Sequence, residues 1–184
     1  MKHVQIIIIL VFIYQFGFAQ SPKEISENDL KKCHLEIEKE VVKLRKELNA
    51  EEYLSDFDKQ ITVDFKIDTL RIEKLLSKKI EIDYSTSGMV NASYEAEIEY
   101  DKLLNKYYQI LAKKLDPADK EILKQSQKNW IAFRDSERKF NSAISKDQYS
   151  GGGTMQRIIV ASGYLEITRK RLFEIVDYLN KLSE

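Results

Sequence analysis

The amino-acid sequence predicts an all-α protein, an antiparallel helical bundle with an additional N-terminal helical region. Apolar residues recur at spacings of three and four over most of the 184-residue chain, which is the periodicity of amphipathic helices. Only two prolines and six glycines occur, and most of them stand between the periodic segments. Hydrophobic residues make up 43% of the chain, which is enough to bury a core and too many for a disordered chain.

The N-terminus carries the pattern of an export signal. Lys2 and His3 precede an apolar run that ends in Gly17-Phe18-Ala19, a small-x-small pattern that signal peptidase accepts. A membrane-spanning anchor is the alternative, but the run is short for a span. We therefore predict a signal peptide over residues 1–19, a secreted or periplasmic protein, and no stable membrane anchor after cleavage.

Residues 20–84 are expected to form an N-terminal helical extension. One apolar stripe predicts a helix from about residue 27 to about residue 54, through Leu30, Cys33, Ile37, Val41, Leu44 and Leu48. Cys33 is the single cysteine, so it cannot form an intramolecular disulfide, and we expect a small buried hydrophobe there.

The next apolar positions alternate with polar ones, at Ile61, Val63, Phe65 and Ile67. A period of two is typical of a strand, but a lone strand would have no partner in a helical chain. We expect an extended connector here, with helix resuming near Asp68 and running to Ile80, followed by a loop over residues 84–88.

Residues 85–184 are expected to form the main helical domain. The first helix spans about residues 89–115, and Asp116 caps a second helix that begins at Pro117. That second helix carries one apolar side, formed by Ile122, Ser126, Trp130, Phe133 and Phe140. A break at residues 150–153 precedes a last helix, which Thr154 can cap and which stays apolar along one side almost to the end of the chain.

Four motifs in order resemble the LprI-like lysozyme-inhibitor family over residues 86–182. They are a D-x-x-L-N-x-x-Y pattern at 101–108, a Q-x-x-W-x-x-F-R-D-x-E pattern at 127–137, the glycine break at 151–153, and Thr-Arg-Lys-Arg at 168–171. The resemblance implies a secreted or periplasmic helical domain in a family whose best-known member inhibits lysozyme. Family members usually carry cysteines at positions where this chain has Ala92, Arg138 and Gly163.

Trp130, Phe133 and Arg134 share one side of the predicted second helix. We expect the two aromatic residues to anchor the core and Arg134 to bond a nearby carboxylate or helix carbonyl. The alternative is that Arg134, Asp135 and Glu137 line a partner-binding surface. Because adjacent helical residues point in different directions, Asp135 and Arg134 are not expected to form a pair.

The glycines Gly151, Gly152 and Gly153 are expected to form a turn between helices. They are not a P-loop, because no strand precedes them and no Lys-Ser or Lys-Thr follows. Backbone amides at the start of the last helix could still receive an anion or a carboxylate of a partner. If the protein plugs an enzyme cleft, this loop and the neighbouring Tyr149 are the best candidates for the contact.

Several function classes are disfavoured by the sequence. A formal net charge of zero argues against nucleic-acid binding. The acidic residues Glu95, Glu97, Glu99 and Asp101 are two apart, so they do not form one glycosidase site, and a solvated face is expected. His34 is the only histidine after the signal peptide, and it adjoins Cys33 rather than standing at a helical ligand spacing. We therefore expect no metal, no cofactor and no enzymatic activity.

The function favoured by the sequence is a binding protein of the cell envelope, a lysozyme inhibitor that acts by steric occlusion. The partner is then a protein, with lysozyme the first candidate. The alternative is a structural or assembly module in which the stripe from Leu30 to Leu48 pairs with another chain as a coiled coil. A helix of the same chain is an equally good partner for that stripe. An envelope hydrolase is the least favoured hypothesis, because no acid and base can be assembled from the sequence.

Overall fold

The computed structural model describes residues 21–53 and 55–182, and the signal peptide predicted over residues 1–19 lies outside them. The described residues form five long helices and one short one, which confirms the all-α prediction: α1 (Glu27–Asn49), α2 (Asp56–Ile82), α3 (Thr86–Lys114), α4 (Pro117–Ile144), α5 (Asp147–Ser150) and α6 (Met155–Lys181). Among these helices, none is long and apolar enough to cross a membrane.

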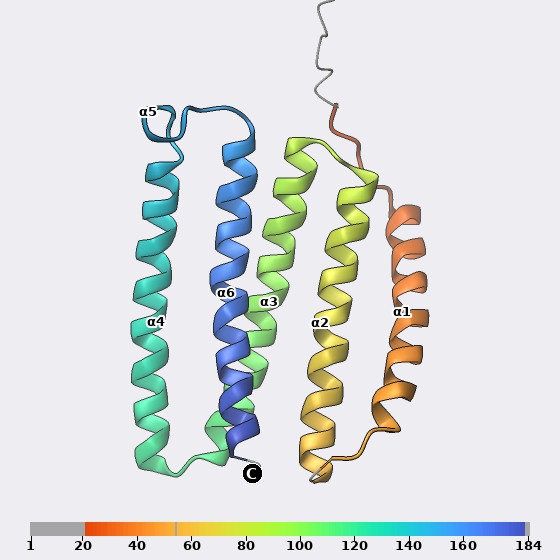
Figure 1. Ribbon diagram of the computed structural model, residues 1–184, viewed down its shortest axis with the longest axis vertical. Coiled ribbons are helices and arrows are strands. Elements are labelled where there is room, and N and C mark those ends of the chain that lie inside the picture. The colour runs from red at the N-terminus through yellow and green to blue at the C-terminus, as the bar shows by residue number, and fades with distance from the viewer. Residues whose placement is uncertain (1–20, 54, 183–184) are drawn as a thin grey trace, which may run out of the picture.

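The long helices lie side by side in the order α4, α6, α3, α2 and α1 across Figure 1. Helices that follow one another in the sequence run antiparallel, as predicted. The central helices α3 and α6 run parallel, and their contact is the most extensive in the molecule. The short helix α5 and the glycines join α4 to α6 at one end of the bundle, and α6 ends at the other (Figure 1).

Side-chain caps fix where four of the long helices begin. Ser26 and Asp29 form a capping box on α1, and the Ser55 and Ser85 hydroxyls accept backbone N–H groups at the start of α2 and α3. Asp116 caps α4 as predicted, accepting from the N–H groups of its second and third following residues. The predicted cap of α6 was wrong: Thr154 already has helical backbone angles, and its side chain makes no capping hydrogen bond.

The extended connector predicted around residues 61–67 was wrong, because these residues lie inside α2. On a helix, two residues two apart point about 200° apart, so alternating apolar positions give two opposite apolar faces. Ile61 and Phe65 pack in the core formed with α3 and α6, whereas Val63 and Ile67 pack against α1. The period of two therefore marks a helix that is buried from both sides.

The apolar stripe of helix α1 contacts another helix of the same chain. Cys33, Ile37, Val41 and Leu48 are buried, as expected of Cys33, and the stripe packs against α2. Three ion pairs join the two helices along this contact: Glu36–Lys78, Glu38–Arg71 and Glu40–Lys74. The helix ends at Asn49, about one turn before the predicted end. The apolar stripe of α1 therefore packs against a helix of the same chain, α2, which was one of the two partners expected for it.

The main core lies between α3 and α6. Its largest fully buried side chains from these two helices are Tyr100, Leu104, Tyr107, Leu172, Ile175 and Leu179. The ring of Phe65 on α2 meets the rings of Tyr107 and Phe173 edge to face, at centroid distances of 5.5 and 5.1 Å. Burial, together with the Glu73 carboxylate that accepts the Tyr100 hydroxyl, raises the pKa of Tyr100. No disulfide contributes to this core, because the single cysteine, Cys33, is free.

The turn from α2 to α3 leaves no room for a side chain at Gly88. The N–H of Ser85 donates to Asp83 Oδ1 at 3.1 Å, and the N–H of Gly88 donates to Ser85 Oγ at 3.0 Å. The hydrogen bonds from Ser85 lower the pKa of the buried Asp83 carboxyl. A Cβ atom on Gly88 would lie 2.4 Å from the backbone oxygen of Asp83, a clash that a rotamer change cannot relieve.

Gly88→Ala should therefore lower the free energy of unfolding by about 2–3 kcal/mol, because the turn must shift to accept the methyl group. The matched control is Gly163→Ala in the interior of α6, where the nearest atom to a new Cβ lies at 3.6 Å. Alanine is the better helix former, so the control should be neutral or stabilising by up to about 1 kcal/mol. Urea denaturation of both variants measures the difference, and equal midpoints would contradict this description of the turn.

Candidate partner-binding surface

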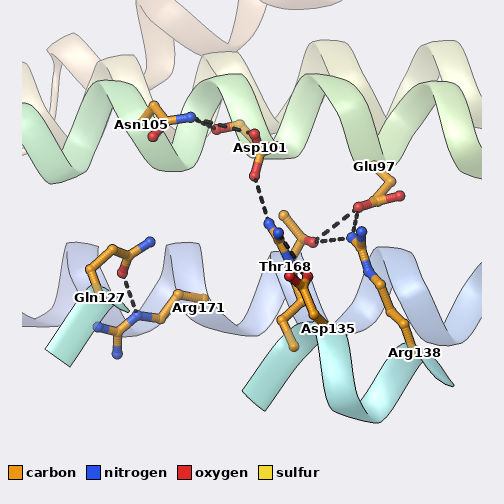
Figure 2. Close-up of polar contacts among 9 residues, drawn as sticks. Glu97, Asp101, Asn105, Gln127, Asp135, Arg138, Thr168 and Arg171 are labelled. Carbon is orange, nitrogen blue, oxygen red and sulfur yellow. Dashed lines mark hydrogen bonds and ion pairs between the residues drawn. The ribbon is translucent and has the colours of Figure 1, made fainter. Parts of the chain in front are cut away.

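The residues of the sequence motifs meet one another where α4 lies against α3 and α6. We call this contact the motif seam, and Figure 2 labels six of its residues: Glu97 and Asp101 of α3, Gln127 and Arg138 of α4, and Thr168 and Arg171 of α6. Arg134 of α4 also belongs to it, through its ion pair with Asp101, and Glu97 and Arg138 lie next to the motifs. The carboxylates on α3 are four residues apart, and so are Arg134 and Arg138 on α4. This matched spacing brings each arginine to one carboxylate.

Arg134 makes the structural contact expected of it. Its Nη1 lies 3.5 Å from Asp101 Oδ1, its guanidinium lies 5.2 Å from the centre of the Trp130 ring, and its side chain is only 19% exposed. The expectation that Asp135 would not pair with Arg134 was wrong, because Arg134 Nε donates to Asp135 Oδ1 at 3.0 Å. The two side chains leave the helix in different directions, but the long arginine folds back along the helix surface.

Arg138 forms the most enclosed ion pair of the seam. Its partner Glu97 has a side chain that is only 14% exposed, so the solvated face predicted for this residue was wrong. Arg138 Nη2 also lies 3.4 Å from Thr168 Oγ1, and the Tyr164 hydroxyl donates to the Arg138 backbone oxygen at 3.0 Å. Arg138 occupies a position where the family resemblance expects a cysteine. A charged contact therefore joins α3, α4 and α6 there.

Arg171 joins the other half of α4 to α6. It is 5% exposed, and its guanidinium donates to Gln127 Oε1 at 3.0 Å, to Ser126 Oγ at 3.2 Å and to Glu174 Oε2 at 2.8 Å. Few apolar side chains of α4 are buried by comparison, since Leu123 is the one fully buried residue of this helix. The motif seam is thus the main attachment of α4 to the bundle.

Only part of the apolar side predicted for α4 faces the core. Trp130 packs against the core as expected, but the same expectation was wrong for Phe133, which is 54% exposed. At 100° per residue, four large apolar residues lie within about 40° of one another on the outside of the helix. We call them the α4 stripe: Ile122, Phe133, Phe140 and Ile144, which are 67%, 54%, 59% and 43% exposed. Glu137 lies beside the stripe and is half-buried.

The segment from residue 145 to residue 154, which we call the α5 loop, projects at the end of the bundle where α4 ends and α6 begins (Figure 1). Tyr149 is 69% exposed there. Gly151, Gly152 and Gly153 have φ angles of 76°, 77° and 93°, a conformation that glycine adopts without strain. The space beside Gly151 and Gly153 is open, so the loop backbone is accessible to a partner.

The α5 loop is held by its own hydrogen bonds. Ser150 Oγ donates to the Ser145 carbonyl at 2.9 Å and accepts from the N–H of Gly152 at 3.1 Å, and the N–H of Gly151 donates to the Asp147 carbonyl at 3.0 Å. Two exposed cations, Lys146 and Arg157, stand at its two ends. A loop ordered before binding loses less conformational entropy when a partner binds. The arrangement therefore suits protein recognition.

The remaining acidic residues on α3 have cationic neighbours. Glu95 pairs with Lys79, and Glu99 with Lys102, and both carboxylates are about half exposed. Within residues 21–53 and 55–182, no three histidine, cysteine, aspartate or glutamate side chains are grouped as metal ligands would be.

A comparison with protein-family models finds the family described as lysozyme inhibitor LprI, matched over residues 79–175, more than half of the chain. The matched segment begins in the last turn of α2 and includes the whole of α3, α4, α5 and the α5 loop. It ends inside α6. No curated protein and no solved structure matches the chain.

Proposed function

The chain belongs to the LprI family of lysozyme inhibitors, and from this membership we propose that it is an exported protein that inhibits lysozyme by sterically blocking its cleft. The α5 loop is the part that enters the cleft. The outer residues of the α4 stripe, Phe140 and Ile144, support it at the rim. We propose residues 85–184 as the inhibitory unit and residues 20–84 as an extension of it, whose helix α2 packs against α3.

The observation that carries this proposal is the combination of an exposed aromatic residue, Tyr149, and two accessible glycines, Gly151 and Gly153, on an ordered loop. Interfaces that bind tightly depend on a few aromatic anchors, which Tyr149 supplies with 69% of its surface free. Ile144 and Met155, at the adjoining ends of α4 and α6, are 43% and 61% exposed and add apolar area around it. This end of the molecule therefore offers both an anchor and a surface to surround it.

The charges of the α5 loop fit the chemistry of the enzyme. Lysozyme cleaves its substrate with two carboxyl groups that face each other across the cleft. Lys146 and Arg157 flank the loop, and a cation placed near a carboxylate in a cleft that excludes water is strongly attracted to it.

The other candidates for partner contact are Arg134, Asp135 and Glu137. The first two are proposed to position the α4 stripe rather than to touch lysozyme. Arg134 and Asp135 hold α4 against α3 through Asp101, which sets the position of the stripe. Glu137, half-buried beside the stripe, is proposed as a rim contact. The motif residues thus position the binding surface, and the α5 loop makes the closest contact.

The purified chain lacking residues 1–19 should stop lysozyme from clearing a suspension of bacterial cell walls, with the clearing rate falling to zero near a 1:1 molar ratio. The chain alone should leave the suspension unchanged, which separates inhibition from a hydrolase activity. An undiminished clearing rate at tenfold molar excess of the chain over lysozyme would contradict the proposed function and leave the fold untouched.

A further inference from the structure

A groove of about 450 Å³ lies over α2, between α1 and α3, away from the α5 loop. We call it the α2 groove. Its floor is apolar and is built by Ile37, Ile72, Leu75, Leu76, Ala92 and Ala96. The two alanines stand one turn apart on α3, and their small side chains leave the space that larger residues would fill. A volume of this size is typical of pockets that enclose a small ligand.

Two ion pairs stand at the rim of the α2 groove, and both cations come from α2. Arg71 donates to both oxygens of Glu38, with Nε–Oε1 and Nη2–Oε2 distances of 2.7 and 2.9 Å. Lys79, two helical turns or about 12 Å further along, pairs with Glu95 of α3. The groove is therefore an apolar channel with an ion pair near each end.

The two members of the Lys79–Glu95 pair differ in their exposure. The Lys79 side chain is 14% exposed, whereas that of Glu95 is 56% exposed. A lysine whose side chain is largely covered favours an anionic partner, because water screens its charge less. Glu95 can turn into solvent at little cost, provided that another anion takes its place at Lys79. The pair thus supplies an enclosed cation whose partner is exchangeable.

We propose that the α2 groove binds a fatty carboxylate, with the acyl chain on the apolar floor and the carboxylate at Lys79 in place of Glu95. A positive headgroup would be repelled by the ammonium group of Lys79 and should bind more weakly. A neutral headgroup would leave Lys79 with Glu95 and would gain nothing from the charge. The site is independent of the lysozyme contact, since α4 and the α5 loop take no part in it.

Calorimetric titration of the chain lacking residues 1–19 with octanoate, decanoate and dodecanoate tests this proposal below their micelle concentrations. Binding at 1:1 is expected, and it should tighten by up to about fourfold for each added methylene until the groove is full. Lys79→Gln should weaken dodecanoate binding at least tenfold. The matched control is Lys78→Gln, because Lys78 pairs with Glu36 and does not line the groove.

Two further ligands test the headgroup: dodecyl maltoside and dodecyltrimethylammonium should each bind at least tenfold more weakly than dodecanoate. Ala96→Leu, checked for an unchanged circular dichroism spectrum, should reduce binding by filling the floor. The proposal is overturned if dodecanoate does not bind, if Lys79→Gln binds it as tightly as the parent chain, or if the maltoside binds equally well.

Discussion

Tyr149→Ala is expected to weaken the inhibition of lysozyme by about 30- to 150-fold while leaving the free energy of unfolding within about 0.5 kcal/mol of the parent value. Truncating a central aromatic anchor costs about 2–3 kcal/mol of binding free energy, which gives this factor. The free energy of unfolding should hardly change, because the Tyr149 side chain is 69% exposed. The inhibition constant comes from the wall-clearing assay, and the stability from urea denaturation.

The control for this prediction is Tyr178→Ala. Tyr178 is 43% exposed and lies near the C-terminal end of α6, at the opposite end of the bundle from the α5 loop. Removing it should change the inhibition constant by less than twofold. If the two tyrosine variants inhibit equally well, the α5 loop is not the contact, whatever the chain does to lysozyme.

Arg138→Met is expected to lower the free energy of unfolding by about 3 kcal/mol. The substitution keeps an apolar stem of similar length but leaves the Glu97 carboxylate, which is 14% exposed, without its cation. Breaking an enclosed ion pair costs more than the pair contributes, because the remaining charge stays out of water. Denaturation by urea at neutral pH measures the loss.

A second substitution separates this cause from lost packing. Adding Glu97→Met to Arg138→Met removes the stranded charge, so the double variant should regain most of the lost free energy. Lys128→Met on the exposed side of α4 is the control and should stay within about 0.5 kcal/mol. A double variant no more stable than Arg138→Met would show that the charge of Glu97 is not what the arginine compensates.

The helices that carry a single apolar stripe were predictable from the sequence. The stripe through Cys33 and Ile37, the Asp116 cap and the glycine break before α6 are all present. The first half of α2 was not predictable in the same way, because Ile61 and Val63 serve two different cores on opposite faces. Two apolar stripes on opposite faces of one helix together give a period of two in the sequence. The residue types alone do not distinguish this pattern from that of a strand.

The candidate surface was predictable only in part. Periodicity shows that one side of α4 is apolar, but it does not tell whether another helix covers that side, so Phe133 was assigned to the core. The ion pairs of the motif seam left a usable signal: two carboxylates four apart on one helix and two arginines four apart on the next. Glu97 was instead assigned to a solvated face, because its partner lies 41 residues further along the chain.

Hydrogen exchange of the chain in complex with lysozyme tests the central claim most directly, since it reports where the partner sits. Amide exchange should slow on binding from residue 133 to residue 159, over the end of α4, the α5 loop and the first turn of α6. Amides of α1 and α2 should exchange as they do in the free chain. Slowed exchange confined to residues 27–82, or no change anywhere at saturating lysozyme, would contradict it.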